Sequence, residues 1–538
     1  MAKETHKETS KSDEAEGSTQ QMRVIKGPEG PLPETPITPE PTRPTEPAQP
    51  AKAAQPSQLP HPAPRQSSDP DAGGVPQETV PMPVGSWTST VVDAPAVTTA
   101  RPPSNPPSLR RRVEQPSSVT RQVEALERPG LFTTELRRAL PPWALPLLTF
   151  QPVSVWLGAR IGLSLLALLA GLMLPSIAAK GTANWYGSPA GPLLTPFIDR
   201  VAGVWTRWDA QWYLKIATEG YRSDDGSAAF FPLYPWILRV VGWLVGERFT
   251  WAGILLSSLF FLGALVLLHR LVRLDFHPED AGRAIFYTAA FPMSFFFWAI
   301  YSESLFLFLA VATLLLARTH RWWWAAFAVA CAIWTRTAGL LLILPLAWEM
   351  WRAYHPPMPT NPNVMPPARP HRWSLASLVL PVLSLVGLLL WANMRFGDPL
   401  AEIKAQTGWN RQFSWPWATV GNAIKEAVQM PFAYQPENQS WTYLGALVFA
   451  LIVGVLALRW LRGSYSLYLW AGILFPLFSA TPHNPLLSYS RFLIVLFPIF
   501  MVLALMGRNR YANQVITWSS ILLLALYTIR FANWFWVA

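Results

Sequence analysis

The sequence predicts an all-α protein that crosses a membrane many times. Of its 538 residues, 51% are hydrophobic and only 14% are charged. From about residue 150 onward, apolar runs of spanning length alternate with short polar links. Lys and Arg flank these runs, so the net charge of +11 reflects the preference of basic residues for the cytoplasmic side. No nucleic-acid partner is therefore needed to explain the charge.

Residues 1–148 are expected to form a disordered, proline-rich cytoplasmic tail. They include stretches such as PLPETPITPEPTRPTEPAQP and have few large apolar residues, so they cannot bury enough surface to offset the entropy of ordering. The start, MAKETHKETSKSDEAEG, lacks the apolar core of a cleaved signal peptide. A protein that recognises proline motifs is a possible partner of this tail, but a solvated tail without a partner is the simpler explanation.

Residues 149–538 form the predicted membrane domain. Its first span is expected at about 153–178, which places the loop 180–230 on the extracytoplasmic side. Residues 230–246 are apolar but short and contain two prolines, so we expect an interfacial or re-entrant segment there. The chain then crosses back at 251–270. Basic residues follow at the end of this span, as expected of a cytoplasmic link.

Two apolar stretches, 284–317 and 322–351, are each too long for a single span. Polar residues lie in the middle of both: Glu303 within YSES and Arg336 within TRT. An arginine at mid-membrane costs at least a few kcal/mol, so we expect two hairpins with these residues at their outer tips. The hairpins also keep the following basic residues on the cytoplasmic side.

Later spans are expected at 373–394, 441–460, 465–480, 490–507 and 514–533. The total is about eleven spans, with the N-terminus inside and the C-terminus outside. Residues 395–440 form a second large outer loop, and residues 481–491 form an outer turn.

The segment Arg207–Tyr234 contains the strongest candidate for a catalytic group. Wound as a helix, residues 208–220 place Lys215 and Glu219 on a polar arc and Asp209 on the opposite, apolar arc. A carboxylate on an apolar face needs a partner or a task. N-capping of this helix explains Asp209 equally well at this point.

The predicted topology collects several polar residues at the outer surface, namely Asp209, Asp224, Asp225, Glu303, Arg336, Asp398, Gln406, His483 and Arg491. Arg336 and Arg491 suit a bound phosphate, or they form structural salt bridges. Glu303 either has a function, caps a helix or pairs with an outer arginine. Turn chemistry is the simpler explanation for Asp224 and Asp225.

Metal and disulfide chemistry are not expected. His483 has no neighbouring ligands at metal-binding spacing, and Cys331 is the one cysteine of the chain. A carboxylate at the membrane edge, beside arginines and an outward-opening cavity, instead suits a lipid-linked phosphate substrate. The carboxylate can take a proton from an acceptor hydroxyl, while arginine holds the departing lipid phosphate.

Six segments of the membrane half resemble the PIG-V family, the GPI mannosyltransferase 2-like enzymes of the GT-C glycosyltransferase superfamily. They are WDAQWYLKIATEGY (208–221), FFPLYP (230–235), YSESLF (301–306), TRTAGLLL (335–342), FGDPLAEIKAQTGW (396–409) and SYSRFLIVLFP (488–498). The resemblance covers nearly all of the membrane half and none of the tail, which such enzymes generally lack.

The resemblance implies a GT-C fold with interfacial helices in the first outer loop. It also implies inverting transfer of a hexose, typically mannose, from a polyprenyl-phosphate donor to a glycan or lipid, without a cofactor or metal. The catalytic acid of such enzymes lies in the first outer loop, which here falls on Asp209. The motif residues expected to contact substrate are Trp208, Tyr213, Glu303, Arg336, Gln406, Trp409 and Arg491.

The resemblance makes the protein an integral membrane enzyme whose active site lies on the extracytoplasmic side. Its Trp-rich, Arg-rich and cysteine-poor composition favours a bacterial cell membrane, and a eukaryotic origin would imply the endoplasmic reticulum. A transporter or lipid flippase is the alternative, but it predicts inverted repeats and charges near mid-membrane. A scaffold whose tail recruits partners is a third, weaker interpretation.

Overall fold

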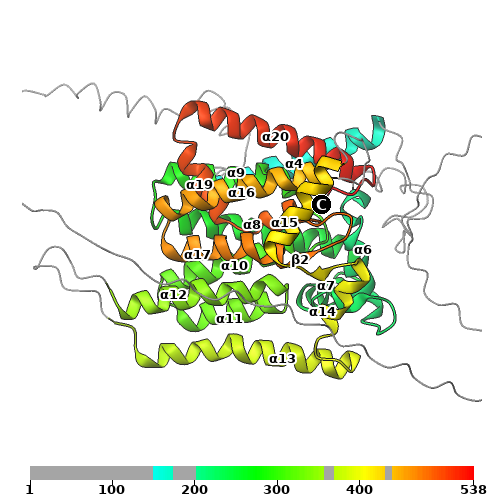
Figure 1. Ribbon diagram of the computed structural model, residues 1–538, viewed down its shortest axis with the longest axis horizontal. Helices are drawn as coiled ribbons and strands as arrows, with labels where there is room; N and C mark the ends of the chain where they lie inside the picture. Colours follow the sequence, from blue (N-terminus) through cyan, green and yellow to red (C-terminus); the bar gives the residue numbers. More distant parts are fainter. Residues whose placement is uncertain (1–149, 174–201, 357–368, 430–438, 538) are drawn as a thin grey trace, which may run out of the picture. The chain divides into compact units, whose positions relative to one another are not determined.

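The computed structural model describes residues 150–173, 202–356, 369–429 and 439–537. This part of the chain is almost entirely helical, with one two-stranded sheet (Figure 1). The predicted tail, residues 1–148, lies outside the described residues, and so does much of the first outer loop.

Five helices within the described ranges are long and apolar enough to cross a membrane. They are α4 (Gln151–Met173), α8 (Phe249–Val272), α13 (Val379–Phe396) with the preceding η5 (Arg372–Leu378), α16 (Ser440–Trp460) and α20 (Arg510–Ala532). Each lies where a span is predicted. Leucines, valines and isoleucines remain exposed along these helices, including Val448 and Ile452 of α16, as a lipid-facing surface requires.

The two predicted hairpins are broken where the sequence indicates. The first consists of α9 (Pro278–Ala290), η3 (Ser294–Phe297) and α10 (Glu303–Arg318), and the second of α11 (Trp322–Ile333), η4 (Thr337–Leu342) and α12 (Ile343–Tyr354). These α-helices have 12 to 16 residues, fewer than the roughly 17–25 of a typical span. The polytopic helical class is therefore confirmed, whereas the predicted total of about eleven spans is not established.

The predicted span 490–507 is divided as well. It contains α18 (Tyr489–Leu493) and α19 (Pro498–Met506), and it follows α17 (Gly463–Leu474) and η7 (Phe475–Phe478). Pro498 has no amide hydrogen to continue a helix, so it begins α19 instead.

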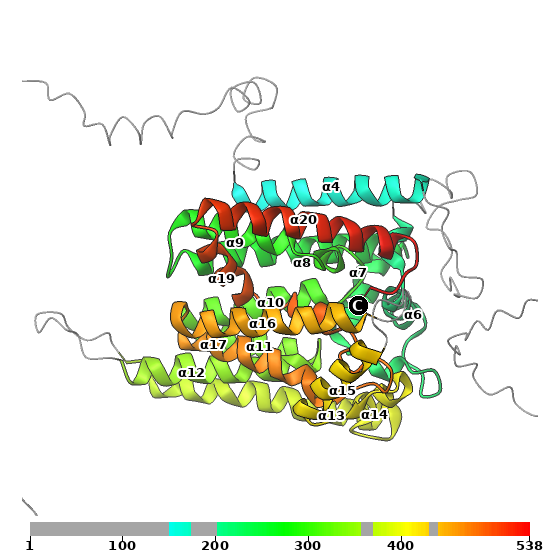
Figure 2. The ribbon, with the colours of Figure 1, turned by 45° about the horizontal axis from the view of Figure 1, so that its top comes forward.

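Helix α10 lies at the centre of the packing, against α8 and α11. Helix α20 runs beside α4, and α12 beside α17, in both views (Figures 1 and 2). The side chains of α10 are mostly buried, including Phe306 and Leu314 at 0% exposure. This environment explains why the polar residue at the start of α10, Glu303, must find partners inside the protein.

Short elements of the two predicted outer loops gather at one end of the long helices, together with α7 after the first loop and β2 before the predicted outer turn 481–491 (Figure 1). They are η1 (Gly203–Thr206), α6 (Asp209–Glu219), η2 (Ser227–Ala229), α7 (Leu233–Leu244), α14 (Ala401–Ala405), η6 (Gln406–Trp409), β1 (Gln412–Phe413), α15 (Pro416–Gln429) and β2 (Ser479–Ala480). Strands β1 and β2 pair antiparallel, with Gln412 opposite Ala480 and Phe413 opposite Ser479. The pairing fixes the second loop to the segment that leads into α18.

Links predicted to be cytoplasmic are joined by ion pairs. Asp280 lies 2.6 Å from Arg283 and 2.7 Å from Arg508, and these contacts connect the start of α9 to the link between α19 and α20. Glu349 of α12 lies 3.1 Å from Arg462 in the link between α16 and α17. The basic residues of these links therefore have structural partners in addition to their predicted role in orienting the chain.

Candidate active site

Helix α6 begins at Asp209, and Trp208 is its N-cap residue. No side chain caps this end, so the structure does not support the capping explanation for Asp209. Trp208 has φ 57° and ψ −123°, a conformation that a residue with a side chain adopts at a cost of about 1–3 kcal/mol. Such strain is concentrated at functional sites in proteins, and here it immediately precedes the candidate carboxylate.

Arg491 contacts two carboxylates at once. Its Nη1 donates to Asp209 Oδ2 at 2.6 Å, and its Nε donates to Glu303 Oε1 at 2.6 Å. The Arg491 side chain is 8% exposed, whereas that of Asp209 retains 21% exposure. The arginine thus belongs to the interior, and the Asp209 carboxylate lies at the edge of solvent.

Glu303 lies between two arginines. Arg336 Nη1 forms an ion pair with the same Oε1 atom at 2.6 Å, and the Glu303 side chain is fully buried. Its other oxygen, Oε2, is buried without a hydrogen-bond partner among the described residues. The tip of the first hairpin is therefore buried and does not face solvent, as a loop tip usually would. Two guanidinium groups offset the cost of burying the Glu303 carboxylate there.

Aromatic rings surround the arginines. The Arg491 guanidinium lies 4.7 Å from the ring centre of Tyr301 and 4.9 Å from that of Phe296. The Tyr301 hydroxyl accepts a hydrogen bond from the Asp209 amide at 3.2 Å and donates to the Arg207 carbonyl at 3.0 Å. Tyr301 therefore fixes both the start of α6 and the arginine that contacts its first carboxylate.

Arg411 is a third arginine in this region, and it is not among the residues predicted from the sequence. Its guanidinium lies 5.5 Å from the ring centre of Phe492. The Arg336 guanidinium lies 5.9 Å from the centre of the same ring. Arg411 Nη2 donates to the Leu487 carbonyl at 3.1 Å. Burial, and secondarily the charge of Arg491, lowers its pKa to about 10.

The charges of this cluster do not balance. Asp209 and Glu303 provide two carboxylates for Arg336, Arg411 and Arg491, and no carboxylate of the described ranges forms an ion pair with Arg411. Arg411 is half-buried, and a partly buried positive charge without a counter-ion is costly, so the site favours an anion. We refer to these five residues as the Asp209 cluster.

Two of the remaining predicted site residues, Trp208 and Tyr213, lie next to this cluster. The Tyr213 hydroxyl is 2.9 Å from Ser302 Oγ, next to Glu303 in the chain. Trp208 contacts the rings of Trp534 and Trp536, with centroids 5.8 Å and 5.2 Å away. Gln406 Nε2 donates to the Ala229 carbonyl at 3.4 Å and so joins the two outer loops. The side chain of Trp409 lies outside the described residues.

The outer aspartates of the loops have turn and ion-pair roles. Asp225 Oδ1 accepts the Ser227 amide at 2.9 Å beside Gly226, and Asp225 pairs with Lys215 at 2.8 Å. Asp398 Oδ1 likewise accepts the Leu400 amide at 2.9 Å. For Asp225, turn chemistry is the explanation that the sequence analysis favoured.

Glu402 of α14 is a second residue that is absent from the predicted site. Its side chain is largely inaccessible, and its Oε1 has no hydrogen-bond partner among the described residues. Burial raises the pKa of this carboxyl to about 8. Nothing in the sequence separates it from an ordinary loop glutamate, because its burial results from packing of α14 against η2.

Residues 160–358 match the family model described as mannosyltransferase (PIG-V). Similar curated proteins are the GPI alpha-1,6-mannosyltransferase 2 of Rattus norvegicus, 31% identical over 194 residues, and that of Mus musculus, 29% identical over 219 residues. The first match covers 34% of this chain and 39% of the relative, and the second covers 39% and 41%. The chain thus matches about two fifths of the length of these relatives.

Among solved structures, the chain is similar to the oligosaccharyltransferase of Archaeoglobus fulgidus in its apo form. The TM-score is 0.33 at 13% sequence identity, covering 70% of this chain and 55% of the other. The family resemblance found in the sequence is confirmed over the matched region. That region contains Asp209, Glu303 and Arg336, whereas Arg411 and Arg491 lie beyond it.

Proposed function

Because residues 160–358 match the PIG-V mannosyltransferases, we propose that this chain is a membrane glycosyltransferase with the Asp209 cluster as its active site. It transfers a hexose, mannose in the first instance, from a polyprenyl-phosphate donor to a glycan or glycolipid acceptor. The site faces the extracytoplasmic side, in a bacterial cell membrane or in the endoplasmic reticulum. The polyprenyl-phosphate donor comes from the membrane in which the protein is embedded.

The observation that carries this proposal is the contact of Arg491 with Asp209. The Arg491 guanidinium holds the Asp209 carboxylate in place, and the strained Trp208 and the Tyr301 hydroxyl fix where α6 begins. Arg491 uses Oδ2, so we assign Oδ1 as the atom that accepts the proton of the acceptor hydroxyl. A positioned general base of this kind contributes roughly 10²–10⁴-fold to a rate.

In the proposed step, the acceptor oxygen forms a bond to the anomeric carbon of the donor sugar. The bond from that carbon to the phosphate oxygen breaks on the opposite face, so the configuration inverts. The acceptor proton moves to Asp209, and the polyprenyl phosphate leaves with the bonding electron pair. The developing negative charge requires cations close to the phosphate.

We assign Arg411 as the main phosphate ligand, with Arg336 beside it. Arg336 and Arg491 both pair with Glu303, whereas Arg411 contributes the excess positive charge of the cluster. Glu303 then acts indirectly, by holding the two arginines at fixed positions. Tyr213, Trp208, Gln406 and Trp409 are assigned to the walls of the substrate site.

Purified full-length chain incubated with polyprenyl-phosphate mannose and candidate glycan acceptors tests this function. The proposal predicts release of polyprenyl phosphate together with a mannosylated acceptor. Movement of intact lipid across vesicles without release of lipid phosphate would instead support the flippase alternative and contradict the proposal.

A further inference from the structure

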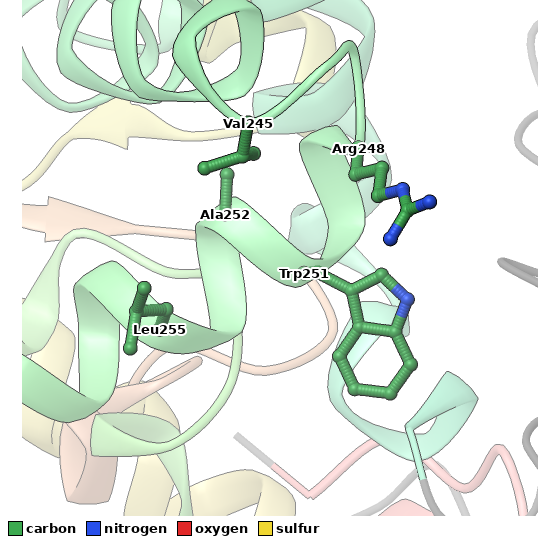
Figure 3. Close-up of a pocket in the computed structure, with 5 residues that line it drawn as sticks. All are labelled: Val245, Arg248, Trp251, Ala252 and Leu255. Atoms are coloured by element: carbon green, nitrogen blue, oxygen red, sulfur yellow. The ribbon is translucent and has the colours of Figure 1, made fainter.

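A hollow of about 280 Å³ lies where α7 ends and α8 begins (Figure 3). It is lined by Val245, Arg248, Trp251, Ala252 and Leu255. In Figure 3 the Arg248 guanidinium lies beside the Trp251 indole at one edge, and the aliphatic side chains line the rest. The hollow thus has one cationic edge and an apolar floor.

The connection between the two helices is tightly built. Gly246 and Glu247 have φ of 74° and 60°, which reverse the chain between α7 and α8. At Gly242 of α7, an added Cβ would come within 2.2 Å of the Phe249 ring, so only glycine permits this approach. The hollow is therefore shaped by a close helix contact in addition to the side chains that line it.

Three of the lining residues, Trp251, Ala252 and Leu255, lie on α8, a helix that can span a membrane. Arg248 and Trp251 lie at its start, and Leu255 follows at helical spacing with 49% exposure. Leu259, four residues further along, is 51% exposed. The apolar floor therefore continues along a predicted lipid-facing surface, with a cation and a tryptophan at the level where a bilayer interface would lie.

We infer that this hollow is a binding site for a phospholipid of the surrounding membrane. The headgroup phosphate binds the Arg248 guanidinium. In the described part of the chain, no carboxylate lies within ion-pair distance of this guanidinium. One acyl chain lies over Val245, Ala252 and Leu255. A phospholipid with net negative charge is preferred over a zwitterionic one, because a choline group would oppose the cation.

The site is connected to the helix that carries Asp209. The Tyr234 hydroxyl of α7 lies 2.7 Å from Ser257 Oγ of α8, and its ring contacts Tyr213 of α6 with centroids 5.1 Å apart. A lipid bound across the α7–α8 connection therefore stabilises the elements on which α6 packs. This inference does not depend on the proposed transferase activity.

Native mass spectrometry of the full chain in detergent, titrated with phosphatidylglycerol or phosphatidylcholine, tests the inference. Wild type should retain phosphatidylglycerol at least about tenfold more strongly than phosphatidylcholine, with a matching rise in melting temperature. Arg248→Gln should lose this preference, and Arg248→Lys should keep most of it. Arg270→Gln, at an exposed arginine near the other end of α8, is the matched control and should behave as wild type.

Equal retention of phosphatidylglycerol by wild type and Arg248→Gln would overturn the site. So would displacement of the bound phosphatidylglycerol by an equimolar short-chain polyprenyl phosphate in wild type, because the hollow would then belong to the donor. Arg248 is exposed and lies outside the core, so Arg248→Gln is expected to fold.

Discussion

Arg491 Nη1 lies 2.6 Å from Asp209 Oδ2, although the two residues are 282 positions apart in the sequence. The same guanidinium holds Glu303, so one side chain joins the first outer loop, the first hairpin and the start of α18. The candidate base therefore depends for its position on an element far along the chain.

Arg491→Lys should reduce sugar transfer by at least about tenfold while preserving the fold. An ammonium keeps the charge but cannot contact both carboxylates in the planar geometry of a guanidinium. Arg491→Gln should also lower stability by about 3–5 kcal/mol, because it leaves buried Glu303 with fewer cations. Transfer rates and thermal unfolding of the two variants check this. Equal transfer by Arg491→Lys and wild type would contradict the positioning role.

Arg411→Gln should weaken inhibition by free polyprenyl phosphate by about 10- to 100-fold, because it removes a charge-assisted contact to phosphate. The dependence of the transfer rate on acceptor concentration should change little. Arg395→Gln, an exposed arginine at the start of the same loop, is the control. If both variants shift inhibition equally, Arg411 has no specific contact with phosphate.

Glu402 should make stability depend on pH. Its folded pKa of about 8 lies above the ordinary glutamate pKa of 4.5, so the folded state binds an extra proton between these values. Stability relative to Glu402→Gln should be greatest below about pH 4.5 and fall as pH rises to 8. Above that it should stay reduced, by an amount on the order of a few kcal/mol. Parallel pH profiles of chemical unfolding for wild type and Glu402→Gln would refute this.

The predicted orientation can be tested by labelling single cysteines. Cys331 is the one native cysteine, so replacing it by alanine gives a cysteine-free background. An impermeant maleimide should label Asp398→Cys from the extracytoplasmic side and should not label Arg321→Cys, in a predicted cytoplasmic link. The reverse pattern would place the Asp209 cluster in the cytoplasm.

Helix breaks were predictable because single residues cause them. Polar residues near Glu303 and Arg336 indicated both hairpin tips, and the proline pair indicated that the segment around α7 is short. The break at Pro498 was also readable from the sequence but was missed, since the surrounding residues are uniformly apolar.

The site was predictable only in part. Asp209, Glu303, Arg336 and Arg491 stand out individually as charges within apolar surroundings. Their pairing depends on contacts between segments up to 282 residues apart, which no local pattern specifies. Arg411 and Glu402 lie in a polar loop where charges are ordinary, so only tertiary packing distinguishes them. The strained backbone at Trp208 likewise has no local sequence signal.

The central claim is that Asp209 accepts the acceptor proton, and Asp209→Asn tests it most directly. With purified enzyme and polyprenyl-phosphate mannose, release of lipid phosphate should fall by about 10²–10⁴-fold. Binding of polyprenyl phosphate and the melting temperature should stay close to wild type. Asp224→Asn, in the same loop with a 76% exposed side chain, should retain full activity. An Asp209→Asn variant that releases lipid phosphate at the wild-type rate would contradict the claim.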